Sequence, residues 1–239
     1  MTPHADPRLL DRCAALVEDA VEGAATDPVT GGRGRRRVLG ISGAPGAGKT
    51  TLVLAVLAAA AQDPRLAGRI AHVPMDGYHL PNAELDRLGR RDRKGAPDTF
   101  DVQAYAATLA TARALPRTAL WAPSFDHAVG EPEPESIEVP LDADLVLTEG
   151  NYLLLPDGGW PTVRDQLDEV WFCDLGAEQR RSRLVDRHVL TGREVDDAEA
   201  WVDRSDEANA RLVVGGRDVA DVVVVDGQIE RPAKAARRS

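Results

Sequence analysis

The sequence has only two cysteines in 239 residues, Cys13 and Cys173, and they form no Cys-x-x-Cys pair. So few thiols, placed so far apart, exclude a disulfide framework and predict a reduced, cytoplasmic protein with Cys173 as a small core residue. No spacing of His and Cys is typical of a zinc site. The cysteines therefore indicate packing rather than chemistry.

Long apolar runs and an excess of positive charge are also absent. No apolar stretch approaches the roughly 20 residues of a membrane helix, and residues 1–10 lack the basic start and apolar core of a secretory signal. The formal net charge of −10 argues against a general nucleic-acid binder. Local basic clusters at 33–37, 87–94 and 180–193 suit a small anionic ligand better than a long polyanion. We expect neither a membrane nor nucleic acid as a partner.

Apolar runs along the chain alternate between strand-like and helix-like periods. Strands are expected at 38–42, 70–75, 119–125, 144–148, 169–175 and 222–225, and helices at 49–62, 102–114, 179–190 and 196–213. This alternation predicts an α/β fold with a parallel sheet that helices cover on both faces. Residues 79–94 should mix helix and loop, and the proline-rich segment 126–140 should be a loop or a small excursion.

The two ends of the chain differ in composition from its centre. Residues 7–25 carry apolar side chains at spacings of three and four, which predicts an amphipathic helix. Residues 26–36, rich in Gly, Arg and Pro, are interpreted as a mobile linker, and 228–239 as a disordered polar tail. We therefore expect one folded domain over 37–227, preceded by a helix and linker at 1–36.

Ligands of a parallel sheet bind beyond the carboxyl ends of its strands. Five residues whose side chains could contact a ligand stand at or just after the ends of the expected strands: Ser42, Asp76, Phe125, Glu149 and Asp174. We expect these side chains to converge on one cleft.

Residues 43–50, Gly-Ala-Pro-Gly-Ala-Gly-Lys-Thr, fit the phosphate-loop pattern G-x-x-x-x-G-K-[ST] in full. A strand is expected before this segment and a helix after it, as the motif requires. Glycines let several N–H groups face one concavity, and the helix N-terminus adds partial positive charge. Lys49 should reach the β and γ phosphates, and the Thr50 hydroxyl should ligate Mg²⁺. The expected ATP contacts are Gly43, Ala44, Gly46, Ala47, Gly48, Lys49, Thr50 and Thr51.

Two carboxylates at strand ends extend this site. Glu149 ends an apolar strand, which is the Walker B pattern for an acid that holds Mg²⁺ or its water shell. Asp76 follows the strand expected at 70–75, which is the next strand along the chain after the one that leads into the phosphate loop. It is placed to act as a base for a hydroxyl, with Gly77 allowing a sharp turn after it. A helix cap or a surface turn is the alternative for either acid. The chain has no N-K-x-D guanine signature and no L-S-G-G-Q sequence, which favours an ATP-dependent kinase over a GTPase or an ABC protein.

At this point the sequence resembles the phosphoribulokinase, uridine kinase and type I pantothenate kinase family of P-loop kinases. The similarity covers about 37–227, and the nearest subgroup is a bacterial one called nucleoside/nucleotide kinase-like, or sugar kinase associated with fructose uptake. It implies a three-layer P-loop fold with a five-stranded parallel core sheet and a small lid near 180–200. The matching blocks are M-D-G-Y-H-L-P-N at 75–82, R-K-G-A-P-D-T-F-D at 93–101, P-S-F-D-H at 123–127, T-E-G-N-Y at 148–152 and A-D-V-V-V-V-D-G at 220–227.

The resemblance also implies roles for individual residues. Asp76 matches the catalytic base, and Lys49 and Thr50 match the residues for ATP and Mg²⁺. Lid arginines that approach the transferred phosphoryl group would be Arg187, as a catalytic residue, and Arg193, as an ATP contact. Contacts to the phosphate acceptor would come from His79, Asp101, Phe125, His127, Arg183 and Asn209. Relatives are often dimers, so a homodimer is implied too.

Several of these assignments have ordinary structural alternatives. The lid arginines alternate with acids, as on any solvated helix face. Residues 90–94 form either a charged loop or a site for an anionic acceptor. His79 and His127 could be structural histidines, and Trp201 is expected to serve packing.

The acceptor stays open at this stage. Uridine kinases read D-S-F-Y where this chain has 76–79 as Asp-Gly-Tyr-His, and Phe125 replaces their stacking Tyr. The Pro81-Asn82 pair is closer to pantothenate kinases, whose long pantothenate-binding segment is not evident. We therefore expect a kinase acting on a sugar, a nucleoside or a pantothenate-like alcohol. A regulatory or chaperone-like NTPase is the alternative.

Overall fold

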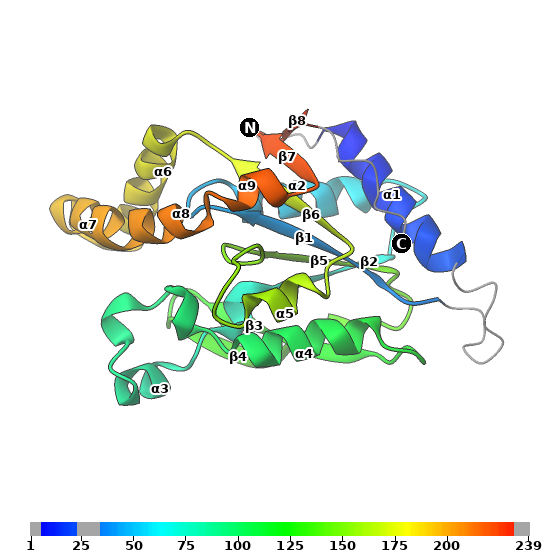
Figure 1. The fold of residues 1–239 in the computed structure, drawn as a ribbon, viewed down its shortest axis with the longest axis horizontal. Helices are drawn as coiled ribbons and strands as arrows, with labels where there is room; N and C mark the ends of the chain where they lie inside the picture. Colours follow the sequence, from blue (N-terminus) through cyan, green and yellow to red (C-terminus); the bar gives the residue numbers. More distant parts are fainter. Residues whose placement is uncertain (1–5, 23–33, 232–239) are drawn as a thin grey trace.

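The computed structural model describes residues 6–22 and 34–231 (Figure 1). A six-stranded sheet with the order β2-β5-β1-β6-β7-β8 forms its centre. The first five of these strands are parallel, and β8 runs antiparallel to β7. The α/β class with a five-stranded parallel core is thus confirmed. The strands are β1 (Arg37–Gly43), β2 (Ile70–Pro74), β5 (Leu145–Gly150), β6 (Glu169–Asp174), β7 (Val222–Val225) and β8 (Gln228–Arg231).

Helices lie on both faces of this sheet (Figure 1). They are α1 (Pro7–Glu22), α2 (Lys49–Ala60), α3 (Asn82–Arg87), α4 (Val102–Arg113), α5 (Trp160–Arg164), α6 (Ala177–Leu190), α7 (Val195–Trp201), α8 (Glu207–Val213) and α9 (Gly216–Val219). Short 3₁₀ turns are η1 (Met75–Tyr78), η2 (Arg91–Arg93) and η3 (Pro97–Thr99), and η4 (Val202–Asp206) is a π-helical turn. The single helix expected at 196–213 is therefore α7, η4 and α8.

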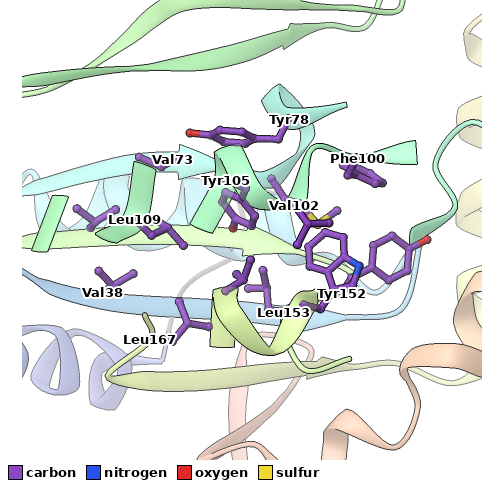
Figure 2. Packing of buried hydrophobic residues seen from close by; sticks show 14 of the residues in the cluster. Val38, Val73, Tyr78, Phe100, Val102, Tyr105, Leu109, Tyr152, Leu153 and Leu167 are labelled. Carbon is purple, nitrogen blue, oxygen red and sulfur yellow. The ribbon is translucent and has the colours of Figure 1, made fainter. Parts of the chain in front are cut away.

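Two buried clusters hold the layers together. Successive residues of a strand point to opposite faces, so Val38 and Val146 join one cluster while Leu39 and Leu147 join the other. The first cluster packs against α4 and α5 and contains most of the buried aromatic residues (Figure 2). The second contains α1 and α2. Cys13 and Cys173 are free thiols within it, as expected for small core residues.

The segment 119–140 differs from the prediction. Strand β3 (Leu120–Asp126) leaves the central sheet and pairs with β4 (Glu131–Val139) in a separate two-stranded antiparallel sheet. Of the two alternatives for 126–140, the loop is wrong, because most of that segment is β4, whereas a small excursion from the central sheet agrees with the separate β3–β4 sheet. Its prolines suit a strand with a free edge, where a missing N–H removes no partner's hydrogen bond.

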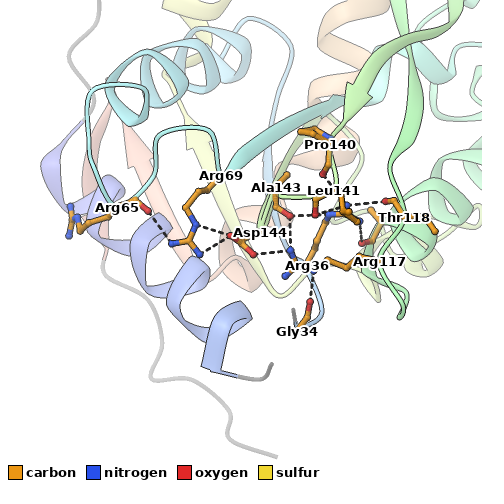
Figure 3. Close-up of polar contacts among 11 residues, drawn as sticks. Gly34, Arg36, Arg65, Arg69, Arg117, Thr118, Pro140, Leu141, Ala143 and Asp144 are labelled. Carbon is orange, nitrogen blue, oxygen red and sulfur yellow. Dashed lines mark hydrogen bonds and ion pairs between the residues drawn. The ribbon is translucent and has the colours of Figure 1, made fainter. Parts of the chain in front are cut away.

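Parts of the expected linker and tail are ordered in the described residues. Residues 228–231, expected in a disordered tail, form β8 and pair with β7 at Val224 and Ile229. Arg36, expected in a mobile linker, is fully buried. Its guanidinium donates to the carbonyls of Ala112, Thr118, Pro140 and Ala143 (Figure 3). The guanidinium of arginine has five N–H donors, so one side chain can satisfy several backbone carbonyls at once. The rest of the expected linker and tail, 26–33 and 232–239, lies outside the described residues.

Gly77 is required for a reason that the sequence did not reveal. It lies in the 3₁₀ turn η1 and is not among the glycines with positive φ. A Cβ at this position would lie only 2.1 Å from the carbonyl oxygen of Pro123 in β3. Gly77 therefore allows the β3–β4 sheet to approach the end of β2, and the expected sharp turn is not its role.

Replacing Gly77 by alanine should lower the free energy of unfolding by about 2 kcal/mol or more, because backbone atoms must move apart. Gly215→Ala is the matched control, since a Cβ there meets nothing within 4 Å and its φ is helical. Urea denaturation of both variants measures the difference. Equal stability of the two would contradict the close-approach explanation.

Candidate active site

The phosphate loop connects β1 to α2 at the carboxyl edge of the sheet. Gly43 ends β1 where a Cβ would lie 2.4 Å from the Cys173 carbonyl oxygen. Gly48 precedes α2 with φ 91°, a left-handed conformation that favours glycine. The backbone between them turns back so that Ala47 N donates to Ala44 O at 3.1 Å. The sequence pattern thus becomes a compact loop before a helix N-terminus, which is an anion-binding arrangement.

Lys49 points from the start of α2 into a buried environment. Its Nζ donates to Ala44 O at 3.1 Å and to Asn151 Oδ1 at 2.6 Å. Burial lowers the pKa of the Lys49 ammonium, and the charge of Glu149 opposes this decrease. Sequence reasoning missed Asn151, although it follows Glu149 in the block at 148–152. The Asn151 amide oxygen thus takes the place that a phosphate oxygen could take as the hydrogen-bond partner of Lys49.

Glu149 ends β5 beside the phosphate loop. The Thr50 hydroxyl donates to Glu149 Oε1 at 3.3 Å, and Glu149 is only 6 % exposed. Burial, together with the nearby charge of Asp76, raises the pKa of Glu149 to about 7. A buried carboxylate next to a hydroxyl is a site that favours a cation.

Asp76 lies at the end of β2, the strand next to β5. The register pairs Pro74 with Glu149, so Asp76 follows directly at the same sheet edge. Its charge affects the pKa values of Lys49, Glu149 and His79. Strand order therefore brings together three residues that are up to 100 positions apart in the sequence.

Two of the sequence blocks that match the family, 75–82 and 93–101, pair with each other next to Asp76. His79 forms an antiparallel bridge with Phe100, and Leu80 N donates to Thr99 O at 2.9 Å. The His79 ring lies between the rings of Phe100 and Phe125, with centroids 4.0 and 4.6 Å away. The blocks at 75–82 and 93–101 thus form one wall next to Asp76.

Other residues expected to bind the acceptor lie around this wall. His127 is exposed, and its ring contacts Phe125 at 5.1 Å. Asp101 caps α4 by accepting from Ala104 N at 2.9 Å, a structural role that the sequence did not lead us to expect for this residue. Asn209 is buried on α8 and donates to Gly95 O at 3.4 Å. Their roles toward an acceptor stay predictions.

Residues 90–94 are largely satisfied within the protein. Arg93 pairs with Asp98 at 2.5 Å, and Arg90 Nη1 donates to Asp98 O at 2.8 Å. Lys94 Nζ donates to Asn82 Oδ1 at 2.6 Å and lies 5.2 Å from the centre of the Phe125 ring. This agrees with the charged-loop interpretation for the two arginines and places Lys94 next to Phe125.

Helix α6 packs directly on the phosphate loop. Arg180, which is 7 % exposed, donates to Pro45 O at 3.3 Å and pairs with Glu207 of α8 at 3.1 Å. The exposed Arg187 is close enough to Lys49 for its charge to lower the pKa of that ammonium. Arg193 instead stacks on Trp201, with its guanidinium carbon 4.3 Å from the ring centre.

Arg183 lies on the opposite side of the loop from His79. It pairs with Asp226 at 3.7 Å in the β7–β8 turn. Both residues line a cavity beside the phosphate loop, with Gly48, Thr51, Leu52, Ala55, Cys173 and Val224. This position does not support the acceptor contact expected for Arg183.

Comparison with known proteins gives three informative relatives. A Schizosaccharomyces pombe protein named "Putative uridine kinase" is 32 % identical over 80 % of this chain and 83 % of its own length. An uncharacterized Escherichia coli protein, YggC, is 35 % identical over 80 % of this chain and 78 % of its own length. A crystal structure named "putative fructose transport system kinase", from Silicibacter, is 32 % identical with a TM-score of 0.72, covering 88 % of this chain and 98 % of that chain. No family model matches. Within the described residues, no helix is long and apolar enough to cross a membrane.

Proposed function

The chain belongs to the phosphoribulokinase, uridine kinase and pantothenate kinase family of P-loop kinases, and we propose that it transfers the γ-phosphoryl group of ATP to a hydroxyl of a small-molecule acceptor in the cytoplasm. The arrangement of Asp76, Glu149 and Lys49 around the phosphate loop carries this proposal. It offers positive charge for phosphates, a carboxylate for a metal ion and a second carboxylate for a proton. A sugar, a nucleoside or a pantothenate-like alcohol is the acceptor class.

The donor nucleotide occupies the loop and the cavity beside it. Backbone N–H groups of residues 43–50 and the N-terminus of α2 hold its phosphates. Lys49 exchanges its contacts with Ala44 and Asn151 for phosphate oxygens. We assign the nucleobase to the cavity next to Thr51, which places Arg183 and Asp226 on the donor side.

Mg²⁺ fits the oxygen pair of Thr50 and Glu149. The Thr50 hydroxyl and the Glu149 carboxylate are 3.3 Å apart. Burial disfavours the charged form of Glu149, and a bound cation would stabilise that form. Among the described residues there is no cluster of three or more His, Cys, Asp or Glu side chains that could hold a metal ion alone. Phosphate oxygens and water would complete the coordination shell of Mg²⁺, as is usual for this ion. The bound ion would neutralise part of the phosphate charge.

Asp76 accepts the proton of the attacking hydroxyl in the transfer step. A bond forms between the acceptor oxygen and the γ phosphorus, the bond from that phosphorus to the β–γ bridging oxygen breaks, and ADP leaves. Lys49 and Arg187 stabilise the negative charge on the transferred group. Closure of the lid segment 180–200 excludes water, and Arg193 must leave Trp201 if it is to contact ATP.

A screen of ATP consumption tests this function. Purified protein with Mg²⁺ and ATP is incubated with D-fructose, other sugars, uridine, cytidine or pantothenate, and ADP release is measured. We expect at least one compound to raise the rate by about 10-fold or more over the acceptor-free rate, with loss of that rate in Lys49→Met. ATP hydrolysis that no metabolite stimulates would instead indicate a regulatory NTPase.

A further inference from the structure

The Asp-Pro-Arg segment at 6–8 holds the turn between β7 and β8. Asp6 N donates to Gly227 O at 3.2 Å, and Ile229 N donates to Asp6 Oδ2 at 3.2 Å. Arg8 Nη2 donates to Ile229 O at 3.4 Å and forms an ion pair with Asp6 Oδ2 at 2.5 Å. The start of α1 and the β7–β8 turn lie side by side (Figure 1), although 223 positions separate Asp6 from Ile229.

Asp6 itself belongs to a firmly packed part of the fold. It is only 3 % exposed, and its carboxylate also accepts from the backbone N–H of Arg8 at 3.0 Å. Directly after it, α1 packs on the central sheet through the fully buried Leu9 and Cys13. The carboxylate therefore holds the β7–β8 turn from a fixed position.

The turn that Asp6 holds forms part of the cavity beside the phosphate loop. Asp226 and Gly227 both line this cavity, together with Gly48 and Thr51. The two turn residues have positive φ, 48° and 77°, as in the two-residue hairpin turn that Asp-Gly favours. The Asp-Gly sequence thus sets the shape of the turn, whereas the contacts with Asp6 help to set where it stands beside the cavity.

The turn has a second, weaker contact on the side of α6. Asp226 pairs with Arg183 at 3.7 Å, and both side chains are more than half exposed, so the pair contributes little. Arg183 also lies in the segment 180–200 that is proposed to close over the site. The contacts of the buried Asp6 do not involve α6, so they can keep the turn in place while α6 moves.

We propose that Asp6 is a positioning residue of the nucleotide site, which holds Asp226 and Gly227 against the nucleobase of the bound donor. This inference rests on the proposed function, which assigns the base to that cavity. Leu52 and Val224 give the cavity an apolar wall that suits the face of a base, and a turn held in place beforehand need not be ordered when the base binds. Asp6 acts only through the turn, so removing its carboxylate should weaken binding of the base and leave binding of the triphosphate unchanged.

Calorimetric titration with ATP and with inorganic tripolyphosphate, both with Mg²⁺, separates these two parts of the donor. Wild-type protein should bind ATP more tightly, and the ratio of the two Kd values measures the contribution of the base. In Asp6→Ala we expect this ratio to fall by about fivefold or more, with the Kd of tripolyphosphate changed by less than about twofold. A loss of folded protein alone affects both ligands equally and leaves the ratio unchanged.

Asp63→Ala is the matched control for this substitution. Asp63 begins a second Asp-Pro-Arg segment, 63–65, and pairs with Arg65 at 2.7 Å just as Asp6 pairs with its arginine. Arg65 in turn pairs with Asp11 of α1 at 3.0 Å and not with the β7–β8 turn. We expect Asp63→Ala to keep the wild-type ratio of Kd values.

Arg8→Met is a second, milder variant at an exposed side chain. It removes the ion pair and the bond to Ile229 O while the Asp6 carboxylate can still accept from Ile229 N. The ratio of Kd values should fall by about twofold. This variant provides the test if Asp6→Ala does not fold.

Three results would overturn the inference while the phosphate site stands. They are an unchanged ratio in Asp6→Ala (or in Arg8→Met, should Asp6→Ala not fold), an equal fall in Asp63→Ala, and equal Kd values of ATP and tripolyphosphate for the wild type. Failure of the proposed kinase function looks different, because wild-type protein would then bind neither ligand, and the inference would fall with it.

Discussion

Asp76→Asn should fold, bind ATP and lose acceptor-dependent ADP formation by about 10²- to 10⁴-fold in kcat, the usual range for a general base. The amide cannot take the hydroxyl proton, yet it is nearly isosteric with the carboxylate. ATP binding should be unchanged or slightly tighter, because removing this charge lowers the pKa of Glu149 and favours its ionised form. Steady-state kinetics and calorimetric ATP titration provide the two measurements.

Asp174→Asn is the matched control for this prediction. Asp174 also ends a parallel strand, β6, but it pairs with Arg217 of α9 at 2.6 Å. It was expected from the sequence to join the cleft, and its ion pair gives it a structural role. We expect its kcat to change by less than about threefold. A wild-type rate for Asp76→Asn would show that another group accepts the proton.

Glu149→Gln should make the protein more stable above pH 7 while reducing phosphoryl transfer by about 100-fold or more. The ordinary pKa of this carboxyl is 4.5, and burial raises it to about 7 in the folded state. Between these pH values the native protein binds more protons than the unfolded chain. The free energy of unfolding of the wild type therefore falls as pH rises through this interval. Glutamine does not titrate and avoids this loss.

The predicted difference in the free energy of unfolding between variant and wild type grows from pH 4.5 to pH 7 and then levels off. A shift of this size corresponds to about 3 kcal/mol at full extent. Urea denaturation at pH 5 and pH 8, without Mg²⁺ or nucleotide, measures it. Glu138→Gln, at an exposed position on β4, should show no pH-dependent gain. A stability difference that is the same at both pH values would contradict the buried-carboxylate explanation.

A substitution that raises stability and lowers activity is expected at a site where ionisable side chains are buried in the absence of a charged ligand. Glu149 and Lys49 are both buried, and burial disfavours the charged form of each. Their hydrogen-bond partners, Ala44, Asn151 and Thr50, are uncharged, and phosphates and a metal ion would supply partners of opposite charge. The site is therefore organised for a charged ligand before the ligand arrives.

Several features could be predicted because they are local in sequence. The phosphate loop is contiguous, and its glycine and lysine requirements follow from the chemistry of phosphate binding. Alternating strands and helices fixed the parallel sheet, and the rule for strand ends located Asp76 and Glu149 at one edge. The structure places both there, next to Lys49, while their catalytic roles stay proposals.

Other features depended on contacts between distant segments. The β3–β4 sheet was missed because prolines weaken a strand pattern unless a free edge tolerates them. Arg36 was assigned to a linker because the carbonyls that bury it come from residues 112–143. The position of Arg183 beside the β7–β8 turn became visible only through its pairing with Asp226, 43 positions later.

The sequence by itself predicted a phosphate loop at residues 43–50 and a parallel sheet, because short-range patterns encode both. Tertiary structure alone decided how the residues around Asp76 and Lys49 are arranged. The bond from His79 to the Asp76 carbonyl, the rings around His79 and the amide of Asn151 on Lys49 all depend on neighbours brought together by folding. A hydrogen-bonding state is a property of partners, and partners far apart in the chain are known only once the chain has folded.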